Sequence, residues 1–305
     1  MIRDPSVGFI GLGNMGGAIA ERLLVSGCVL HICDRDARAV TRLATLGGVP
    51  HVSAKSIADA ADIVFTCLPN IAASGDVVYG ASGLSEGGRL RCLVEMGTVG
   101  PALVREFADH FSPRGIALVD APVSGGAPAA RAGSLTIMVA AAADGRRLVD
   151  PLLALISSSI IVIGESPGDA QTMKLINNLL AAANMAVSFE ALVLGVKLGL
   201  RPSKMTEVIS RSSGANTGFT ARRIDAIRSR RFDNGGKIAL LDKDVALAFE
   251  QATQAGFPIG SMPALTGMAK LWEKAVAQGL ANEDVTALVK VVEGMAGLEV
   301  LESDS

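Results

Sequence analysis

The chain has 305 residues, of which half are hydrophobic and only 4% aromatic, and its 28 Lys and Arg residues nearly balance 30 Asp and Glu residues. This length favours two domains with large aliphatic cores, and the charge balance argues against the concentrated basic face of a nucleic-acid-binding protein. No charged leader opens the chain, and no uncharged apolar run reaches the roughly 18–20 residues needed to cross a bilayer. We therefore expect a cytoplasmic protein that contacts neither nucleic acid nor membrane.

The first predicted element is an apolar strand at 7–10 that breaks into a glycine-rich turn before a helix at 14–26. Gly11, Gly13 and Gly16 have the G-x-G-x-x-G spacing of dinucleotide-binding turns, in which two glycines allow a close approach to the pyrophosphate and the third lets the helix pack on the strand. The helix N-terminus also attracts phosphates. We therefore expect the whole turn to bind a dinucleotide, through Gly11, Leu12, Gly13, Asn14, Met15 and Gly16.

The second predicted strand, at 29–33, ends at Asp34, and Arg35 follows it. A carboxylate at this position accepts hydrogen bonds from the adenosine ribose and repels a 2′-phosphate by about 4 kcal/mol at ~4 Å in an effective dielectric near 20. Arg35 would attract that phosphate instead. We expect both residues at the adenosine end of the cofactor, with NAD preferred over NADP.

Strands and helices continue to alternate up to residue 163, with further strands at 49–52, 62–68, 90–95, 116–120, 135–140 and 160–163 and helices at 36–46, 71–79 and 101–112. Apolar strands separated by helices predict a doubly wound parallel sheet, to which the closely spaced later strands could add an antiparallel edge. Because ligands lie beyond the carboxyl ends of such strands, the loops after two of them should line the cofactor, through Leu68, Pro69 and Thr98.

The four cysteines lie in or beside apolar strand-like segments with no zinc-binding spacing, so we expect reduced thiols and no metal site. Two later segments suggest chemistry. Ser124, Gly125 and Gly126 follow a strand and offer a hydroxyl and unobstructed backbone N–H groups to a substrate carboxylate. Lys174 lies in an apolar helical wall, which favours the neutral amine and suits proton transfer, and Asn178 shares its helix face. The alternative is a lysine that reaches out to solvent.

After residue 164 the pattern becomes helical to the end of the chain. The stretch 169–200 lacks proline and would form about 45 Å of helix at 1.5 Å per residue, a length typical of a helix that joins domains. Further helices are predicted at 202–213, 219–230, 240–255, 261–278 and 282–299. We expect a dinucleotide-binding domain over 1–164 and a helical domain for substrate binding or oligomerisation over 165–305.

Together these motifs, in this order, resemble the β-hydroxyacid dehydrogenase family, which includes 3-hydroxyisobutyrate dehydrogenases and tartronate semialdehyde reductases. The resemblance implies a Rossmann-type domain followed by an all-α domain, with Ser124, Gly125 and Gly126 on the substrate carboxylate. It also implies that Lys174 is the catalytic acid/base, that Asn178 contacts the substrate, and that Lys243 reaches the cofactor. Family members commonly form homodimers or homotetramers.

The implied activity is hydride transfer between a nicotinamide cofactor and a small β-hydroxy acid or semialdehyde. Two alternatives stay open: a semialdehyde or glyoxylate reductase that works mainly in the reducing direction with NADPH, and a nucleotide-binding sensor without catalysis. The similar 6-phosphogluconate dehydrogenases have a longer helical part, and imine reductases generally lack a lysine at the Lys174 position. One departure is Gly97, where the family pattern Asp-x-Ser-Ser/Thr has a hydroxyl. We expect the missing side chain to open space for a larger or less hydroxylated acid.

Overall fold

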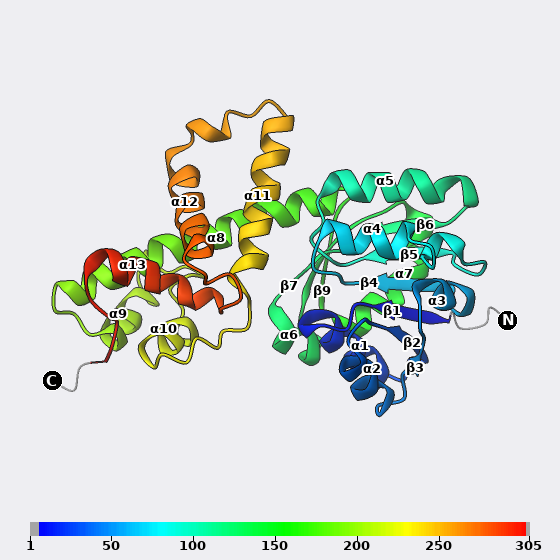
Figure 1. Ribbon diagram of the computed structural model, residues 1–305, viewed down its shortest axis with the longest axis horizontal. Helices are drawn as coiled ribbons and strands as arrows, with labels where there is room; N and C mark the ends of the chain where they lie inside the picture. Colours follow the sequence, from blue (N-terminus) through cyan, green and yellow to red (C-terminus); the bar gives the residue numbers. More distant parts are fainter. Residues whose placement is uncertain (1–5, 303–305) are drawn as a thin grey trace. The chain divides into compact units, whose positions relative to one another are not determined.

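The computed structural model describes residues 6–302, which form two compact units (Figure 1). The units divide between Lys174 and Leu175, inside the long helix α8 (Asp169–Lys197). The sequence pattern instead places the domain boundary at 164/165, in the turn before that helix. The predicted boundary lies where strands give way to helices. In the structure, the first turns of α8 belong to the same compact unit as the sheet, so the observed boundary falls later.

The first unit is built on one sheet with the strand order β3-β2-β1-β4-β5-β6-β8-β7, and β9 pairs with β8. The first six strands are parallel, β8 is antiparallel to β6 and β7, and β9 is parallel to β8. The predicted doubly wound sheet with an antiparallel edge is therefore confirmed. Its strands are β1 (Val7–Ile10), β2 (Leu30–Cys33), β3 (Val49–Pro50), β4 (Ile63–Thr66), β5 (Cys92–Glu95), β6 (Ala117–Asp120), β7 (Val123–Ser124), β8 (Thr136–Ala140) and β9 (Ser159–Gly164).

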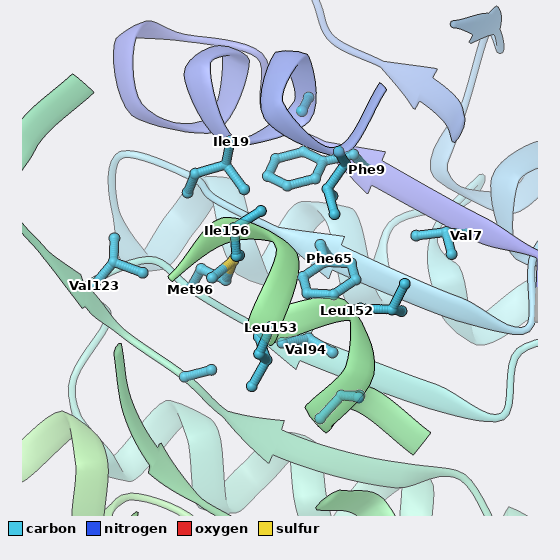
Figure 2. Packing of buried hydrophobic residues seen from close by; sticks show 14 of the residues in the cluster. Val7, Phe9, Ile19, Phe65, Val94, Met96, Val123, Leu152, Leu153 and Ile156 are labelled. Carbon is cyan, nitrogen blue, oxygen red and sulfur yellow. The ribbon is translucent and has the colours of Figure 1, made fainter. Parts of the chain in front are cut away.

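Helices cover both faces of this sheet because its central strands are apolar on both sides. In β1, Phe9 packs with the cluster that contains α1 (Asn14–Val25), α2 (Ala37–Ala44), α6 (Gly126–Ala132) and α7 (Ala143–Ile156). Ile10 points to the other cluster, with α3 (Ala54–Ala60), α4 (Ile71–Tyr79) and α5 (Pro101–Phe111). Figure 2 shows Phe9 and Phe65 of neighbouring strands among the first cluster, and their rings stack with centroids 5.9 Å apart.

Three helices of the first unit, α3, α6 and α7, were not among the sequence predictions. Their local signals are weak or mixed. The seven residues of α3 are fixed by a capping box in which Ser53 and Ser56 satisfy each other's backbone N–H groups. α6 begins at a glycine, and α7 contains Pro151. Burial of their apolar residues against the sheet outweighs these weak local preferences.

The second unit is built from helices, as expected, and an isolated bridge between Lys237 and Asp284 is the β pairing among its described residues. Its core surrounds the fully buried Trp272. The Trp272 indole N–H donates to the Ala182 carbonyl at 3.3 Å. The predicted helix at 282–299 is interrupted: a 3₁₀ turn, Val285–Leu288, precedes α13 (Val289–Ala296). The other helices are α9 (Pro202–Ile209), α10 (Ala221–Arg228), α11 (Ile238–Gln254) and α12 (Pro263–Ala277).

By length and composition alone, α8 could cross a membrane, although no uncharged stretch of that length occurs in it. Half of its most apolar 18-residue window is buried inside the protein. A core helix of a globular protein has these same properties, so α8 gives no support for membrane insertion.

Candidate active site

The carboxyl ends of five parallel strands lie side by side at one edge of the sheet. The register pairs Cys33 with Ile10, Ile10 with Thr66, Thr66 with Glu95, and Glu95 with Asp120. The loops that leave these strands carry the predicted cofactor residues of the first unit. The glycine turn, Asp34, the Leu68–Pro69 loop and Thr98 all follow strands that end at this edge. The strand order reverses at β1, which lies between β2 and β4, and such a switch point is where doubly wound folds bind ligands.

The glycine turn has the geometry that a dinucleotide needs. Gly11 has φ +94°, and a Cβ there would lie 2.4 Å from the Cys67 carbonyl oxygen. A Cβ on Gly16 would lie 1.9 Å from the carbonyl oxygen of Gly11, so this glycine allows α1 to pack against the turn. Gly13 is exposed, and no atom lies within 4 Å of a Cβ placed on it. That open space at the start of α1 fits a pyrophosphate bound to the helix N-terminus.

Asp34 lines a hollow of about 430 Å³ next to this turn. Its carboxylate accepts hydrogen bonds from the N–H of Leu12 and from the N–H of Asp36, the latter at 2.7 Å, and so joins the end of β2 to the glycine turn. Arg35 is 85% exposed, pairs with Asp76 at 3.2 Å and does not line the hollow. The hollow is lined instead by three arginines that sequence reasoning missed, Arg38, Arg42 and Arg131.

Two of these arginines share one acidic partner on α1. Glu21 lies 3.5 Å from the Arg42 guanidinium and 3.4 Å from that of Arg131. The two arginines come from α2 and α6, so no local motif could have indicated that they meet. The hollow therefore has a mixed lining, in which the carboxylates of Asp34 and Asp36 lie among the arginines.

The space beside Gly97 is filled, which corrects the expectation that the missing hydroxyl opens the substrate pocket. Glu95 is 1% exposed, and its carboxylate accepts hydrogen bonds from the Gly97 N–H at 2.7 Å and from the Thr66 hydroxyl at 2.9 Å. A Cβ on Gly97 would lie 2.7 Å from Glu95 Oε1 and 3.0 Å from the carbonyl oxygen of Leu68. The longer acidic side chain at 95 and the glycine at 97 therefore fit each other.

This fit predicts that the Gly97→Ser variant is less stable by about 1–3 kcal/mol, the usual cost of overpacking a core. Combining it with Glu95→Asp, which restores the family pattern, should recover much of that loss because the shorter carboxylate withdraws from the new side chain. Urea unfolding of the wild type, both single variants and the double variant gives the coupling energy. Additive effects, or a fully stable Gly97→Ser variant, would contradict the assigned fit.

Asp120, at the end of β6, caps the first turn of α8. It is fully buried, and its Oδ2 accepts hydrogen bonds from the N–H groups of Gly168 and Gln171, both at 3.0 Å. Burial raises the pKa of the Asp120 carboxyl to about 6, while the hydrogen bonds from Gln171 and Gly168 act in the opposite direction. A carboxylate at a helix N-terminus also interacts favourably with the helix dipole. Asp120 therefore fixes the start of α8 to the sheet.

Lys174 lies one turn farther along α8 and is only 8% exposed, which rules out the alternative of a lysine in open solvent. The charge of Lys174 acts on Cys67, the residue after β4. Burial, with a smaller contribution from the charge of Glu95, raises the pKa of the Cys67 thiol to about 12, and the charge of Lys174 acts in the opposite direction. Lys174 is therefore close enough to the ends of β4 and β5 to act electrostatically on the residues there.

The predicted substrate turn begins at Ser124, the last residue of β7, and runs into α6. Ser124 is half-buried, Gly125 has φ +131° and Gly126 has φ +79°. Residues other than glycine rarely adopt these φ angles, so the backbone conformation requires glycine at both positions. The absence of side chains also leaves the backbone N–H groups accessible. This agrees with a turn that presents backbone donors beside the Ser124 hydroxyl.

In the second unit, Asp244 brings together two predicted residues and was itself missed. The Asn178 amide donates to Asp244 Oδ2 at 2.6 Å, and Lys243 Nζ lies 2.9 Å from Asp244 Oδ1. Asp244 is 6% exposed, and it is adjacent to Lys243 on α11. The only signal in the sequence was that adjacency. Within residues 6–302, no cluster of three His, Cys, Asp or Glu side chains could hold a metal ion.

Comparisons with known proteins support the same interpretation. Residues 6–164 match the NAD-binding domain of 6-phosphogluconate dehydrogenase, and residues 168–292 match the NAD-binding region of NADP-dependent 3-hydroxyisobutyrate dehydrogenase. The 2-(hydroxymethyl)glutarate dehydrogenase of Eubacterium barkeri is 37% identical over 98% of this chain and 99% of its own.

Solved structures agree with this result. The 3-hydroxyisobutyrate dehydrogenase of Salmonella typhimurium superposes with a TM-score of 0.84 at 25% identity, covering 93% of this chain and 99% of its own. Psf3 in complex with NADP+ and 2-OPP gives a TM-score of 0.84 at 26% identity, covering 94% of this chain and 99% of its own. The motifs, the fold and these relatives lead to one conclusion: the chain belongs to the β-hydroxyacid dehydrogenase family and is an NAD(P)-dependent oxidoreductase.

Proposed function

We propose that this enzyme transfers a hydride between NAD and a small β-hydroxy acid or its semialdehyde, with Lys174 as the acid/base. The observation that carries the proposal is the burial of Lys174 in the same compact unit as the glycine turn, within electrostatic range of the ends of β4 and β5. Lysine is rarely buried, because desolvation of the ammonium group is costly, and a buried lysine beside a ligand-binding strand edge is suited to proton transfer.

When bound, a nicotinamide cofactor supplies or accepts the hydride at C4. In the oxidation direction, the neutral Lys174 amine takes the proton of the substrate hydroxyl. In the reduction direction, the Lys174 ammonium group donates that proton to the developing alkoxide. Ser124 and the N–H groups of Gly125 and Gly126 hold the substrate carboxylate, and Asn178 and Lys243 have the roles that the family resemblance implies, one on the substrate and one on the cofactor.

The preference for NAD rests on Asp34. Its carboxylate lines the hollow next to the glycine turn, and hydrogen bonds from Leu12 and Asp36 fix its orientation. A carboxylate there accepts hydrogen bonds from the ribose hydroxyls and repels a 2′-phosphate. Arg38 and Arg42 line the same hollow and favour the alternative, an NADPH-dependent semialdehyde or glyoxylate reductase.

A panel of acids and semialdehydes, each assayed with both cofactors, tests the proposal. It should include 3-hydroxyisobutyrate, tartronate semialdehyde and 2-(hydroxymethyl)glutarate, and we expect kcat/KM to be higher with NAD(H) than with NADP(H). A strong preference for NADPH would reject the role given to Asp34. Tight NADH binding by calorimetry without turnover of any acid would instead favour the nucleotide-binding sensor.

We also propose that the protein is cytoplasmic and forms a homodimer or homotetramer. The second unit supports self-association, because Leu180, Val187 and Leu194 of α8 are exposed and follow one another at intervals of seven residues, on one helix face. Sedimentation velocity tests the assembly.

A further inference from the structure

A buried polar cluster joins the start of α8 to the sheet edge one turn before Lys174. We call it the Gln171 hub, and it consists of Gln171 with its partners Asp120, Gly97, Val99 and Gly100. The Gln171 side chain has no exposed surface. Its Nε2 donates to the Gly97 carbonyl and to Asp120 Oδ1, both at 3.0 Å, and its Oε1 accepts from the N–H groups of Val99 and Gly100 at 3.0 and 3.1 Å.

The hub uses every donor and acceptor atom of the Gln171 side chain. The Gln171 backbone N–H also donates to Asp120 Oδ2 at 3.0 Å, so a single residue is attached to the loop after β5 and to the end of β6. Such a residue has little rotational freedom. An apolar side chain would be enough to pack the helix against the sheet. These directional hydrogen bonds also fix the distance of the first turn of α8 from the sheet and its rotation about the helix axis.

Lys174 is three residues after Gln171 and therefore lies on the same side of the helix, about 4.5 Å farther along its axis. The other titratable groups near the hub are Glu95, which accepts a hydrogen bond from the Gly97 N–H, and Cys67, whose thiol responds to the charges of both Glu95 and Lys174. A shift of the first turn would thus move the ammonium group of Lys174 relative to the sheet edge that carries the glycine turn.

We propose that Gln171 and Asp120 are positioning residues of Lys174, which they hold in the geometry required for proton transfer. The inference rests on the role proposed for Lys174. It assigns a purpose to two fully buried polar residues whose hydrogen bonds all go to other parts of the first unit, and it predicts that their loss lowers kcat more than it weakens cofactor binding. Because a misplacement of about 1 Å can cost about 10²-fold in rate, we expect a fall of about 10- to 100-fold in kcat.

The Gln171→Glu variant is the sharpest single test because it keeps the size of the side chain. It removes the donor to Gly97 and places a second carboxylate 3.0 Å from Asp120 Oδ1. Two carboxylates so close hold one proton between them at a pH where isolated carboxyls are ionised. We therefore expect the kcat of the variant, divided by that of the wild type at the same pH, to rise as the pH falls.

The exchanged double variant Asp120→Asn/Gln171→Glu is the matched control. The amide introduced at position 120 would accept from the backbone N–H groups of residues 168 and 171 and donate to the new carboxylate, which accepts from Val99 and Gly100. The bond to the Gly97 carbonyl is lost, and a carboxylate oxygen faces that carbonyl oxygen instead. We expect this variant to recover most of the wild-type kcat without the pH dependence of the single variant, while NADH affinity stays constant across all three.

The outcomes separate the two proposals. Wild-type turnover is measured first, and its absence with every acid of the panel counts against the proposed function. Given wild-type turnover, a Gln171→Glu variant with normal kcat at all pH values would overturn the positioning role. So would a loss of kcat that is independent of pH, unrelieved in the double variant and matched by an equal loss of NADH affinity and of Tm, because that result describes a merely structural residue.

Discussion

The Lys174→Met variant should lose about 10²–10⁴-fold in kcat, the usual contribution of a general acid/base, and should retain its affinity for NADH. Methionine fills a similar volume in the buried site, so the helix can keep its packing while the proton-transferring group is removed. Stopped-flow or steady-state rates in both directions, with fluorescence titration of NADH, measure the two quantities separately.

Lys197→Met is the matched control for this variant. Lys197 is on the same helix but is exposed, and it belongs to the second unit, so the same substitution there should leave kcat unchanged. Near-normal activity of Lys174→Met would reject the catalytic role. An equal loss in the two variants would show that the effect comes from the helix rather than from the amine.

The second large effect is expected for Gly13→Ala. The protein itself has room for this methyl group, since no atom lies within 4 Å of the added Cβ and the φ of Gly13 is −63°. The methyl would occupy the space in which a pyrophosphate approaches the N-terminus of α1. We expect the Kd of NADH to rise tenfold or more, a loss of about 1.4 kcal/mol or above, with little change in Tm.

Gly75→Ala provides the comparison for Gly13→Ala. Gly75 lies within α4, and a Cβ there also meets no atom within 4 Å. Alanine is favoured over glycine inside helices, so this variant should be slightly more stable and bind NADH normally. Unchanged NADH affinity in Gly13→Ala would mean that the cofactor does not lie against this turn.

The elements that local patterns specify were predicted well. The strands at 7–10, 29–33 and 62–68 are short apolar runs between turn signals, and the structure contains β1, β2 and β4 there. The glycine turn was recognisable because its three glycines meet different local demands, a positive φ at Gly11, close packing at Gly16 and open access at Gly13. The long apolar stretch from 169 onward predicted α8 for the same reason: its signal is contained in consecutive residues.

The remaining features depend on residues that are distant in the sequence. The missing side chain at Gly97 led us to expect empty space, because the sequence does not reveal that the Glu95 carboxylate lies against this glycine. The arginines that line the hollow beside Asp34 come from α2 and α6, and the partners of Gln171 come from two different strand ends. Asp244 is a similar case, since only the fold brings Asn178 to it across 66 residues of sequence.

The division of the chain within α8 has a consequence for how this family can diversify. The glycine turn, Ser124 and Lys174 belong to the first unit, whereas Asn178, Lys243 and Asp244 belong to the second. A crossover between homologous genes at the codons for 174 and 175 would therefore exchange the proposed contacts of Asn178 and Lys243 and leave Lys174, the proposed acid/base, with its own glycine turn. If the roles proposed for these residues hold, such an exchange would change the contacts with the acid while the proton-transferring group keeps its place in the first unit.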